Sequence, residues 1–513
     1  MSSRLKLVGL VAVPALLAAA VPAAYAVGTP QPHSTRAAIT GDVLKGLKQD
    51  ATRTGNVATG KRISVAISLT ARNDKALDTF VAKVSNPRSS SYGHYLTKRQ
   101  FAARFGRTDA EIKQLKDYLR AQGLTVTAVH TGNLLVDASG TAAQLEKAFG
   151  TKLSTWKDAA SGRSFYANDT APTLPTAIAS LVSDVAGLNN RAQLHHQSAS
   201  TVAPRNGPGG GYTPAQLKGG YNVSGTYTGS GQKIALIEFD GFQQSNITKY
   251  DTNYSLGSPT PTVQKVDGGS GALGDGQVEV ELDIEVLHAI APKANVTVFE
   301  GPNSDAGEVD TYQAIVDSGI PTTSISWGAA ESARTTSNIN AVDAVFKAGA
   351  AQGLGFYAAS GDSGSDDAGD GGTSVDYPAS DPYVTGVGGK ADRHLGQRLE
   401  QGGGLVGRRW RQVLRLQDPQ LADRGAEERR RRLPPGAGRL GPRQPQPRRL
   451  DLLAGLLVLG RRHQRGSTRM GRLRRPLQPA GRGGRRRQPR LRQPRPLHGE
   501  RHRLPRHHQR QQR

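Results

Sequence analysis

The stretch GQVEVELDIEVLHAIAP, residues 276–292, predicts a helix with four carboxylates, two of which lie on its apolar side. At about 100° per residue, Glu279 and Asp283 fall together, and apolar residues flank them on both sides. Burying two like charges is costly unless they share a proton or find partners. We therefore expect a buried acid pair, although a solvated acidic face is the commoner use of such spacing. The opposite face, which we expect to meet water, holds Glu281, Glu285 and His288.

Apolar segments alternate with helical ones around this stretch, and that alternation predicts a parallel α/β sheet. Functional groups of such a sheet gather at the C-terminal ends of its strands. Two of these ends are unusual: SISWG, residues 324–328, and AASGDSGSDD, residues 358–367, where Asp362 follows a buried strand. The expected strands are KIALIEF (233–239), ANVTVFE (294–300), TTSISW (322–327) and GLGFYAAS (353–360).

Residues 40–190 predict a separate, small α+β domain of the ferredoxin-like kind. A strand at ISVAISL (63–69) precedes a helix at TDAEIKQLKDYLRAQG (108–123), where Thr108 and Glu111 are spaced as a capping box. Two further strands, LTVTAV and NLLVDA, are expected to pair across a turn before a helix at 141–149. Residues 191–211 are rich in polar residues, Pro and Gly, which predicts a linker to the α/β domain at 212–390.

The first 26 residues have the pattern of a secretory signal peptide. Arg4 and Lys6 precede an apolar run that ends in a small-residue cleavage site, Ala24-Tyr25-Ala26. A membrane anchor is the alternative, but prolines interrupt a run too short to span a bilayer. The sequence thus predicts a secreted, extracellular protein, and with no cysteine it has neither a disulfide framework nor a thiolate metal site.

The net charge of +25 lies entirely in the last part of the chain. Residues 391–513 contain 34 Arg, no Lys and 8 acidic residues, whereas the first 390 residues hold 33 basic and 34 acidic groups. This tail consists mainly of Arg, Pro, Gly, Gln and Leu, so it cannot bury enough apolar surface to fold alone. It is interpreted as a disordered basic arm that binds polyanions, as a low-complexity linker, or as the wrong reading frame of a GC-rich gene.

Several motifs, in order along the chain, resemble the sedolisin family of secreted serine-carboxyl peptidases, kumamolisin-like members included. The resemblance runs from about residue 40 to residue 389. It implies a subtilisin-like catalytic domain preceded by an activation propeptide that acts as chaperone and intramolecular inhibitor. The motifs are YGHYLT (92–97), YTPAQLKGGYN (212–222), Glu279-x-x-x-Asp283, SISWG, SGDSG and YPASDPYVTGVGG (377–389).

The same resemblance implies roles for five residues. Glu279 is similar to the general base of the family, Asp283 to the carboxylate linked to it, and Asp362 to the acid on the oxyanion side. Glu238 and Trp327 resemble the outer members of the hydrogen-bond network. The chemistry is coherent in itself, since two adjacent buried carboxylates share a proton and take one from a serine only in an acidic medium. A protonated Asp362 can donate a hydrogen bond to an oxyanion.

The serine nucleophile itself is missing. No Gly-Thr-Ser tripeptide occurs in residues 391–513, and Ser467, the only serine there, has a different setting. Shifted forward by one base, the degenerate codons of residues 459–471 admit a Gly-Gly-Thr-Ser segment, which places the expected serine near Gln464. We therefore expect a frame slip near Lys390 that removed the end of the catalytic domain. The calcium site expected for the family is lost with it, so no metal ligands are assigned.

This interpretation predicts an acid-acting endopeptidase scaffold that is inactive in this chain and acts, by family, on proteins or peptides. We expect a monomer with no specific nucleic-acid partner and no membrane partner. The alternative is a non-catalytic secreted protein that binds polyanions or inhibits other proteins through its basic tail. A Ser-His-Asp enzyme of the subtilisin type is disfavoured because none of the 12 histidines lies in a Gly-His-Gly-Thr-like segment.

Overall fold

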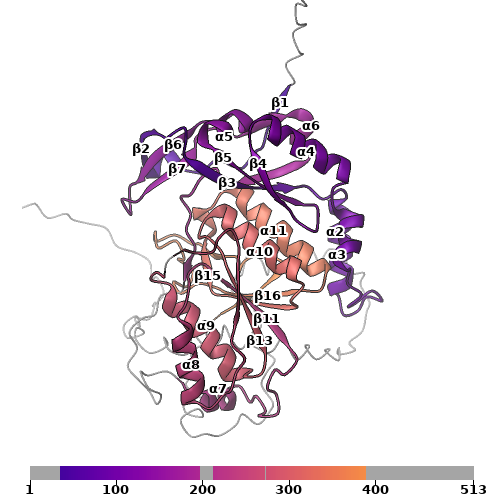
Figure 1. Ribbon diagram of the computed structural model, residues 1–513, viewed down its shortest axis with the longest axis vertical. Coiled ribbons are helices and arrows are strands. Elements are labelled where there is room, and N and C mark those ends of the chain that lie inside the picture. The colour runs from indigo at the N-terminus through magenta and orange to yellow at the C-terminus, as the bar shows by residue number, and fades with distance from the viewer. Residues whose placement is uncertain (1–34, 197–211, 272, 389–513) are drawn as a thin grey trace, which may run out of the picture. The chain divides into compact units, whose positions relative to one another are not determined.

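The structure is a computed structural model that describes residues 35–196, 212–271 and 273–388. The expected signal peptide, most of the linker and the Arg-rich tail lie outside the described residues. Within those ranges no helix has the length and apolar character needed to cross a membrane. The described chain forms an N-terminal α+β domain and a parallel α/β domain (Figure 1).

The N-terminal domain is built on an antiparallel sheet with the strand order β4-β5-β3-β9. Its strands are β3 (Arg62–Leu69), β4 (Thr125–Val129), β5 (Leu135–Thr141) and β9 (Val182–Ala186). This order, with helices between β3 and β4 and between β5 and β9, is the ferredoxin-like arrangement that the sequence predicted. The helices are α2 (Asp74–Ser85), α3 (Lys98–Phe105), α4 (Asp109–Ala121) and α5 (Ala142–Phe149).

Local signals define these helices as expected. Thr108 accepts a hydrogen bond from the backbone N–H of Glu111, and the Glu111 carboxylate accepts from the backbone N–H of Thr108. The same reciprocal cap opens α5 at Thr141. The remaining elements of this domain are β1 (Arg36–Ala38), α1 (Leu47–Asp50), β2 (Ala51–Asn56), β6 (Leu153–Asp158), β7 (Ser164–Asn168), β8 (Thr173–Pro175) and α6 (Thr176–Ala179).

The second domain contains a parallel sheet with the order β12-β13-β11-β14-β16-β18. Every pair of neighbours in it is parallel, which confirms the predicted α/β sheet and its four expected strands. The strands are β11 (Lys233–Glu238), β12 (Thr262–Lys265), β13 (Asn295–Glu300), β14 (Thr322–Ile325), β16 (Gly355–Ala359) and β18 (Val384–Val387).

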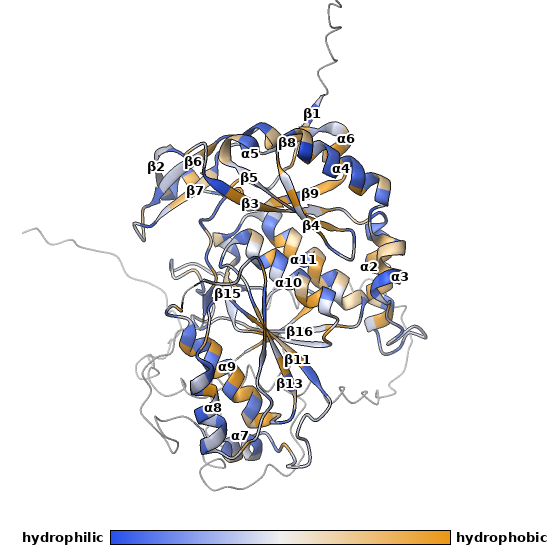
Figure 2. Ribbon diagram, viewed as in Figure 1, coloured by the Kyte–Doolittle hydropathy of each residue, from blue (hydrophilic) through white to orange (hydrophobic). Residues whose placement is uncertain are grey.

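Helices cover both faces of this sheet. Figure 1 shows α8 (Gln244–Asn253) and α9 (Gln277–Ile290) on one side, and α10 (Asp305–Ser318) and α11 (Thr336–Ala351) on the other. Hydrophobic residues of α10 and α11 (Figure 2) join one core with those of the strands. Further elements are α7 (Pro214–Gly220), β15 (Trp327–Ala330), β17 (Asp376–Tyr377) and a short 3-10 turn at Glu331–Ala333.

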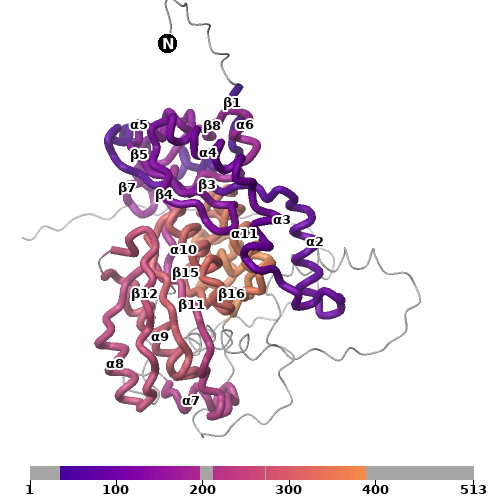
Figure 3. Tube along the Cα trace, turned by 45° about the vertical axis from the view of Figure 1, so that its right-hand side comes forward, coloured from indigo at the N-terminus to yellow at the C-terminus, as the bar shows by residue number. Residues whose placement is uncertain are grey.

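The two domains meet through α10 and α11. Both helices pack against strands of the ferredoxin-like sheet, α10 on β3 and α11 on β9, and α11 also packs on α2 (Figure 3). Phe101 and Phe105 of α3 share a buried apolar cluster with Ala348 and Ala351 of α11. The N-terminal domain therefore packs on the α10 and α11 side of the α/β domain, away from α8 and α9.

Candidate functional site

The candidate site starts at the C-terminal ends of β11 and β14, two neighbours in the parallel sheet. Glu238 is the last residue of β11, and Trp327 follows the end of β14 by two positions. The Nε1–H of Trp327 donates a hydrogen bond of 2.7 Å to Oε2 of Glu238. Glu238 is completely buried and Trp327 is 5% exposed. A carboxylate and an indole are therefore joined inside the sheet edge where functional groups are expected.

Asp283, in the middle of α9, is the next member of this group. Burial raises the pKa of Asp283 well above its usual value, the adjacent Glu238 raises it further, and a hydrogen bond with Ser326 opposes the rise. Glu279 lies one turn earlier on the same helix face and is 4% exposed. The prediction that these two carboxylates point inward is confirmed, and the carboxylate that raises the pKa of Asp283 is Glu238 of β11.

Asp240, which the sequence analysis missed, anchors the start of α9. Its carboxylate accepts hydrogen bonds from the backbone N–H groups of Gly274 and Gly276, both at 2.9 Å. Gly276 has no side chain with which to cap the helix, so Asp240 satisfies donors that would otherwise be left open. A Cβ atom on Gly276 would lie 2.5 Å from the Trp327 ring, so the helix start fits closely against the site. An acidic residue directly after a buried strand was the available signal.

Asp362 lies in the loop after β16, the neighbour of β14 in the sheet, and its side chain is exposed. Gly361 before it has φ of +75°, and a Cβ there would lie 2.3 Å from Oδ1 of Asp367. Only glycine suits that position. The structure thus brings Glu238, Asp283, Glu279 and Trp327 into one buried region and puts Asp362 at the same edge of the sheet.

The serine nucleophile expected near Gln464 and the calcium site lie outside the described residues. Of the expected site residues, the described part of the chain therefore holds the carboxylates and Trp327. The only cluster of three or more His, Cys, Asp or Glu with metal-ligand spacing in the described residues is elsewhere, at the contact between the domains.

The expectation that His288 is solvated is wrong. Its side chain is completely buried, and Nδ1 lies 3.0 Å from both carboxylate oxygens of Asp251, at the end of α8. Burial lowers the pKa of His288, and Asp251 partly offsets the effect. The same helix α8 covers the rest of this face, where burial raises the pKa of Glu285 to about 7. Helical periodicity alone could not show that a second helix packs there.

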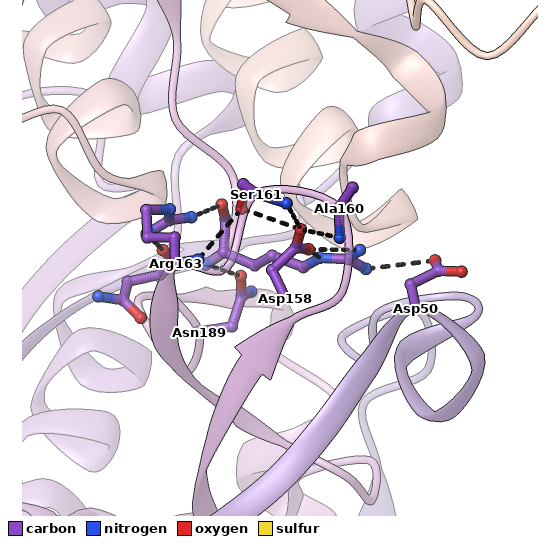
Figure 4. Close-up of polar contacts among 8 residues, drawn as sticks. Asp50, Asp158, Ala160, Ser161, Arg163 and Asn189 are labelled. Carbon is purple, nitrogen blue, oxygen red and sulfur yellow. Dashed lines mark hydrogen bonds and ion pairs between the residues drawn. The ribbon is translucent and has the colours of Figure 1, made fainter. Parts of the chain in front are cut away.

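The segment after the N-terminal domain is anchored before it reaches the site. Arg191 pairs with Asp158 at 3.0 Å and with Asp50 at 3.5 Å, and Asp158 also accepts from the backbone N–H of Ser161 (Figure 4). These bonds hold the pKa of Asp158 at about 2. Three residues later the backbone of Leu194 exchanges two hydrogen bonds of 2.8 Å with the side-chain amide of Asn303.

That segment then forms a strand against the site, so the predicted linker at 191–211 is wrong for its first residues. β10 (His195–His196) pairs antiparallel with β15, with His195 opposite Gly328 and His196 opposite Trp327. The His196 ring packs edge-on to Trp327, with 5.4 Å between ring centroids. The polar sequence gave no sign that this segment pairs through its backbone with the buried strand β15. The chain therefore lays its own backbone beside the residue that contacts Glu238.

Comparison with known proteins finds similarity in both domains of the chain. Residues 49–191 match the family model described as Pro-kumamolisin, activation domain. The chain is 30% identical over 362 residues to kumamolisin of Bacillus sp. (strain MN-32), an alignment that covers 65% of this chain and 63% of that protein. It is 30% identical to xanthomonalisin of Xanthomonas sp. (strain T-22) over 64% of this chain and 45% of that protein, and 27% identical to sedolisin of Pseudomonas sp. (strain 101) over 65% and 60%. The chain thus spans between 45% and 63% of the length of these relatives.

Proposed function

The chain belongs to the sedolisin family, and we propose that residues 212–388 are the first part of a serine-type endopeptidase domain that works in acid. Glu279 is the general base, Asp283 the carboxylate linked to it, and Asp362 the acid that stabilises the oxyanion. Glu238 and Trp327 hold the pair in place. The contact from Trp327 to Glu238, beside the protonated Asp283, is the observation that carries this proposal.

The chemistry follows from the shared proton. A carboxylate pair that retains one proton offers one basic oxygen, and that oxygen accepts the proton of a serine hydroxyl when the second carboxyl stays neutral. A singly protonated pair of this kind persists only while the pH is low enough, because raising the pH removes the shared proton and leaves two adjacent charges. The substrates we propose are proteins or peptides that lie as a strand beside β15, where β10 lies now.

The N-terminal domain is the activation propeptide in this proposal. It delivers β10 to β15 through the bonds of Arg191 and Leu194, so its own chain occupies the position where a substrate backbone would pair. In this proposal the domain acts as an intramolecular inhibitor. Because it also packs on α10 and α11, it serves as a template on which the α/β domain folds. We further propose secretion, from the pattern of residues 1–26.

We also propose that this chain is inactive, because residues 391–513 contain no Gly-Thr-Ser motif, and that a frame slip removed the motif, since a one-base shift of the degenerate codons admits a Gly-Gly-Thr-Ser segment near Gln464. The first test is to sequence the gene across codons 380–400. A one-base slip near Lys390 is expected there. An intact frame would overturn the proposed origin of the tail.

The second test is acid proteolysis of a protein substrate by two purified chains, the present one and one from the frame-corrected gene. We expect cleavage by the corrected chain alone, and loss of that cleavage in its Glu279→Gln variant. A corrected Glu285→Gln variant is the matched control, since Glu285 lies on the same helix but on the face that α8 covers. Cleavage by the present chain, or an inactive corrected chain, would overturn the proposal.

A further inference from the structure

Three side chains at the contact between the domains bring ligand atoms within 4.8 Å of one another: His130, Asp137 and Asp310. His130 follows β4 and Asp137 lies in β5, so both belong to the N-terminal domain. Asp310 lies on α10 of the α/β domain. None of the residues assigned to peptidase chemistry is among them, so this cluster is a separate feature of the molecule.

His130 is oriented as a metal-binding histidine would be. Its Nδ1 lies 3.0 Å from Oδ2 of Asp317, and Gln313 donates to the other oxygen of Asp317 at 2.9 Å. Its Nε2 points into the cluster, 2.8 Å from Oδ2 of Asp137. Histidines that bind metals usually give their second ring N–H to a carboxylate, which fixes the ring and its tautomer. Asp317 occupies that position here.

The two carboxylates of the cluster are buried without enough donors. Asp137 is 7% exposed and Asp310 is 4% exposed. Oδ1 of each is buried and has no hydrogen-bond donor within the described ranges. The carboxylate of Asp310 also lies beside those of Asp137 and Asp267. A site with these orphaned oxygens calls for a cation or a bound proton.

We propose that His130, Asp137 and Asp310 bind a divalent metal ion that links the N-terminal domain to the α/β domain. Two carboxylates and a neutral imidazole balance the charge of such an ion. Imidazole nitrogen with carboxylate oxygen suits Zn²⁺ or Mn²⁺. The ligand atoms of a tetrahedral Zn²⁺ are about 3.4 Å apart, and the atoms of this cluster lie near that spacing, at 2.8 Å from Nε2 of His130 to Oδ2 of Asp137 and within 4.8 Å for the whole set.

Asp267 gives the site a route to solvent. It is exposed, it adjoins Asp310, and it offers a further carboxylate to complete the coordination or to capture the ion on entry. The bound ion would tie β5 to α10 at a contact that otherwise sets three carboxylates close together. It would therefore strengthen the attachment of the N-terminal domain, whether or not the chain has peptidase activity.

The test is a calorimetric titration of the metal-free full chain with Zn²⁺, and separately with Mn²⁺, at neutral pH. The affinity of one site is expected to fall at least tenfold in Asp310→Asn and in His130→Gln, and about 10- to 100-fold in Asp317→Asn, whose side chain only orients the histidine. Asp251→Asn is the matched control, because it alters the other buried His–carboxylate pair, at His288, and should bind as the parent does. Histidines of the tail, such as His507 and His508, also bind Zn²⁺, so the variants are compared in chains that all carry it.

Thermal unfolding with and without Zn²⁺ distinguishes a variant that has lost the metal site from a variant that has failed to fold. Metal-free Asp310→Asn is expected to fold, since the amide removes a buried like charge, whereas Zn²⁺ should raise the unfolding temperature of the parent and of Asp251→Asn only. If Asp310→Asn does not fold, Asp137→Asn takes its place. Equal binding in the parent and in these variants would overturn the metal site. So would a parent that binds neither ion, and a shared proton would then explain the cluster.

Discussion

The helices α9 and α10 follow one another along the chain, and both bury acidic side chains. The buried acids of the two helices have different partners. On α10, Glu308 is 1% exposed and forms an ion pair with the equally buried Arg334, which also donates to Asn338 at 3.1 Å. On α9, Asp283 meets another carboxylate, Glu238. Burial raises the pKa of Glu308 and Arg334 opposes that rise, whereas Glu308 raises the pKa of Arg334 above its ordinary value, so each side chain favours the charged form of the other.

The difference separates a structural acid from a chemical one. An acid beside a buried arginine meets a cation that favours its charged form, and the ion pair joins α10 to the segment before α11. An acid beside another acid must hold a proton, and the proton is available for transfer. Asp310 of α10 lies only two positions from Glu308 but also faces carboxylates, and there we propose a metal ion where α9 has a proton. The partner, and not the helix or the depth of burial, decides which kind an acid is.

Removing the arginine should give the largest effect. Arg334→Met leaves Glu308 buried without its cation, and we expect a loss of about 3–5 kcal/mol in the free energy of unfolding, measured by urea denaturation. The double variant Arg334→Met/Glu308→Leu should recover most of that loss, because no buried charge remains. A loss below about 1 kcal/mol in the single variant would show that the pair of Glu308 and Arg334 contributes little to stability and has no special structural role.

Replacing Asp283 should change how stability depends on pH. The pKa of Asp283 is higher in the folded protein than its ordinary value, so the folded state binds the proton more tightly. That contribution is full at pH values below the unfolded pKa and is lost as the pH rises through the folded pKa. Relative to Asp283→Asn, the parent should lose up to about 1.4 kcal/mol per pH unit as the pH rises above about 4. The curves of free energy of unfolding against pH, measured by urea denaturation, would run parallel if Asp283 were ionised in the fold.

Much of this comparison could be predicted from the sequence. Period and capping signals located the strands and helices of both domains, and the helical wheel showed that Glu279 and Asp283 face inward. The motifs led to Glu238 and Trp327, which the structure joins by a hydrogen bond. These successes share a cause, since each depends on residues close in sequence or on a pattern that one element carries by itself.

What the sequence could not predict depends on packing between distant segments. The helical wheel placed His288 on the water-facing side because it takes no account of α8, which packs there. Asp251 of α8 lies within hydrogen-bond distance of the His288 ring. The polar segment at His195 and His196 became a strand because β15 offered an unpaired edge. The cluster of His130, Asp137 and Asp310 unites two domains, so no local spacing could indicate it.

The smallest effect is expected from removing the hydrogen bond that Trp327 donates to Glu238, the carboxylate beside Asp283. Trp327→Phe keeps the ring but removes the Nε1–H that donates to Glu238, and we expect a loss of about 1 kcal/mol in the free energy of unfolding. In an Asp283→Asn background the loss should be smaller, because the new amide can donate to Glu238 instead. A double-mutant cycle from urea denaturation measures the difference. Strictly additive losses would mean that Trp327 and Asp283 act on Glu238 independently, and Asp283 of α9 and Glu238 of β11 would then be two isolated carboxyls and not one proton-sharing unit.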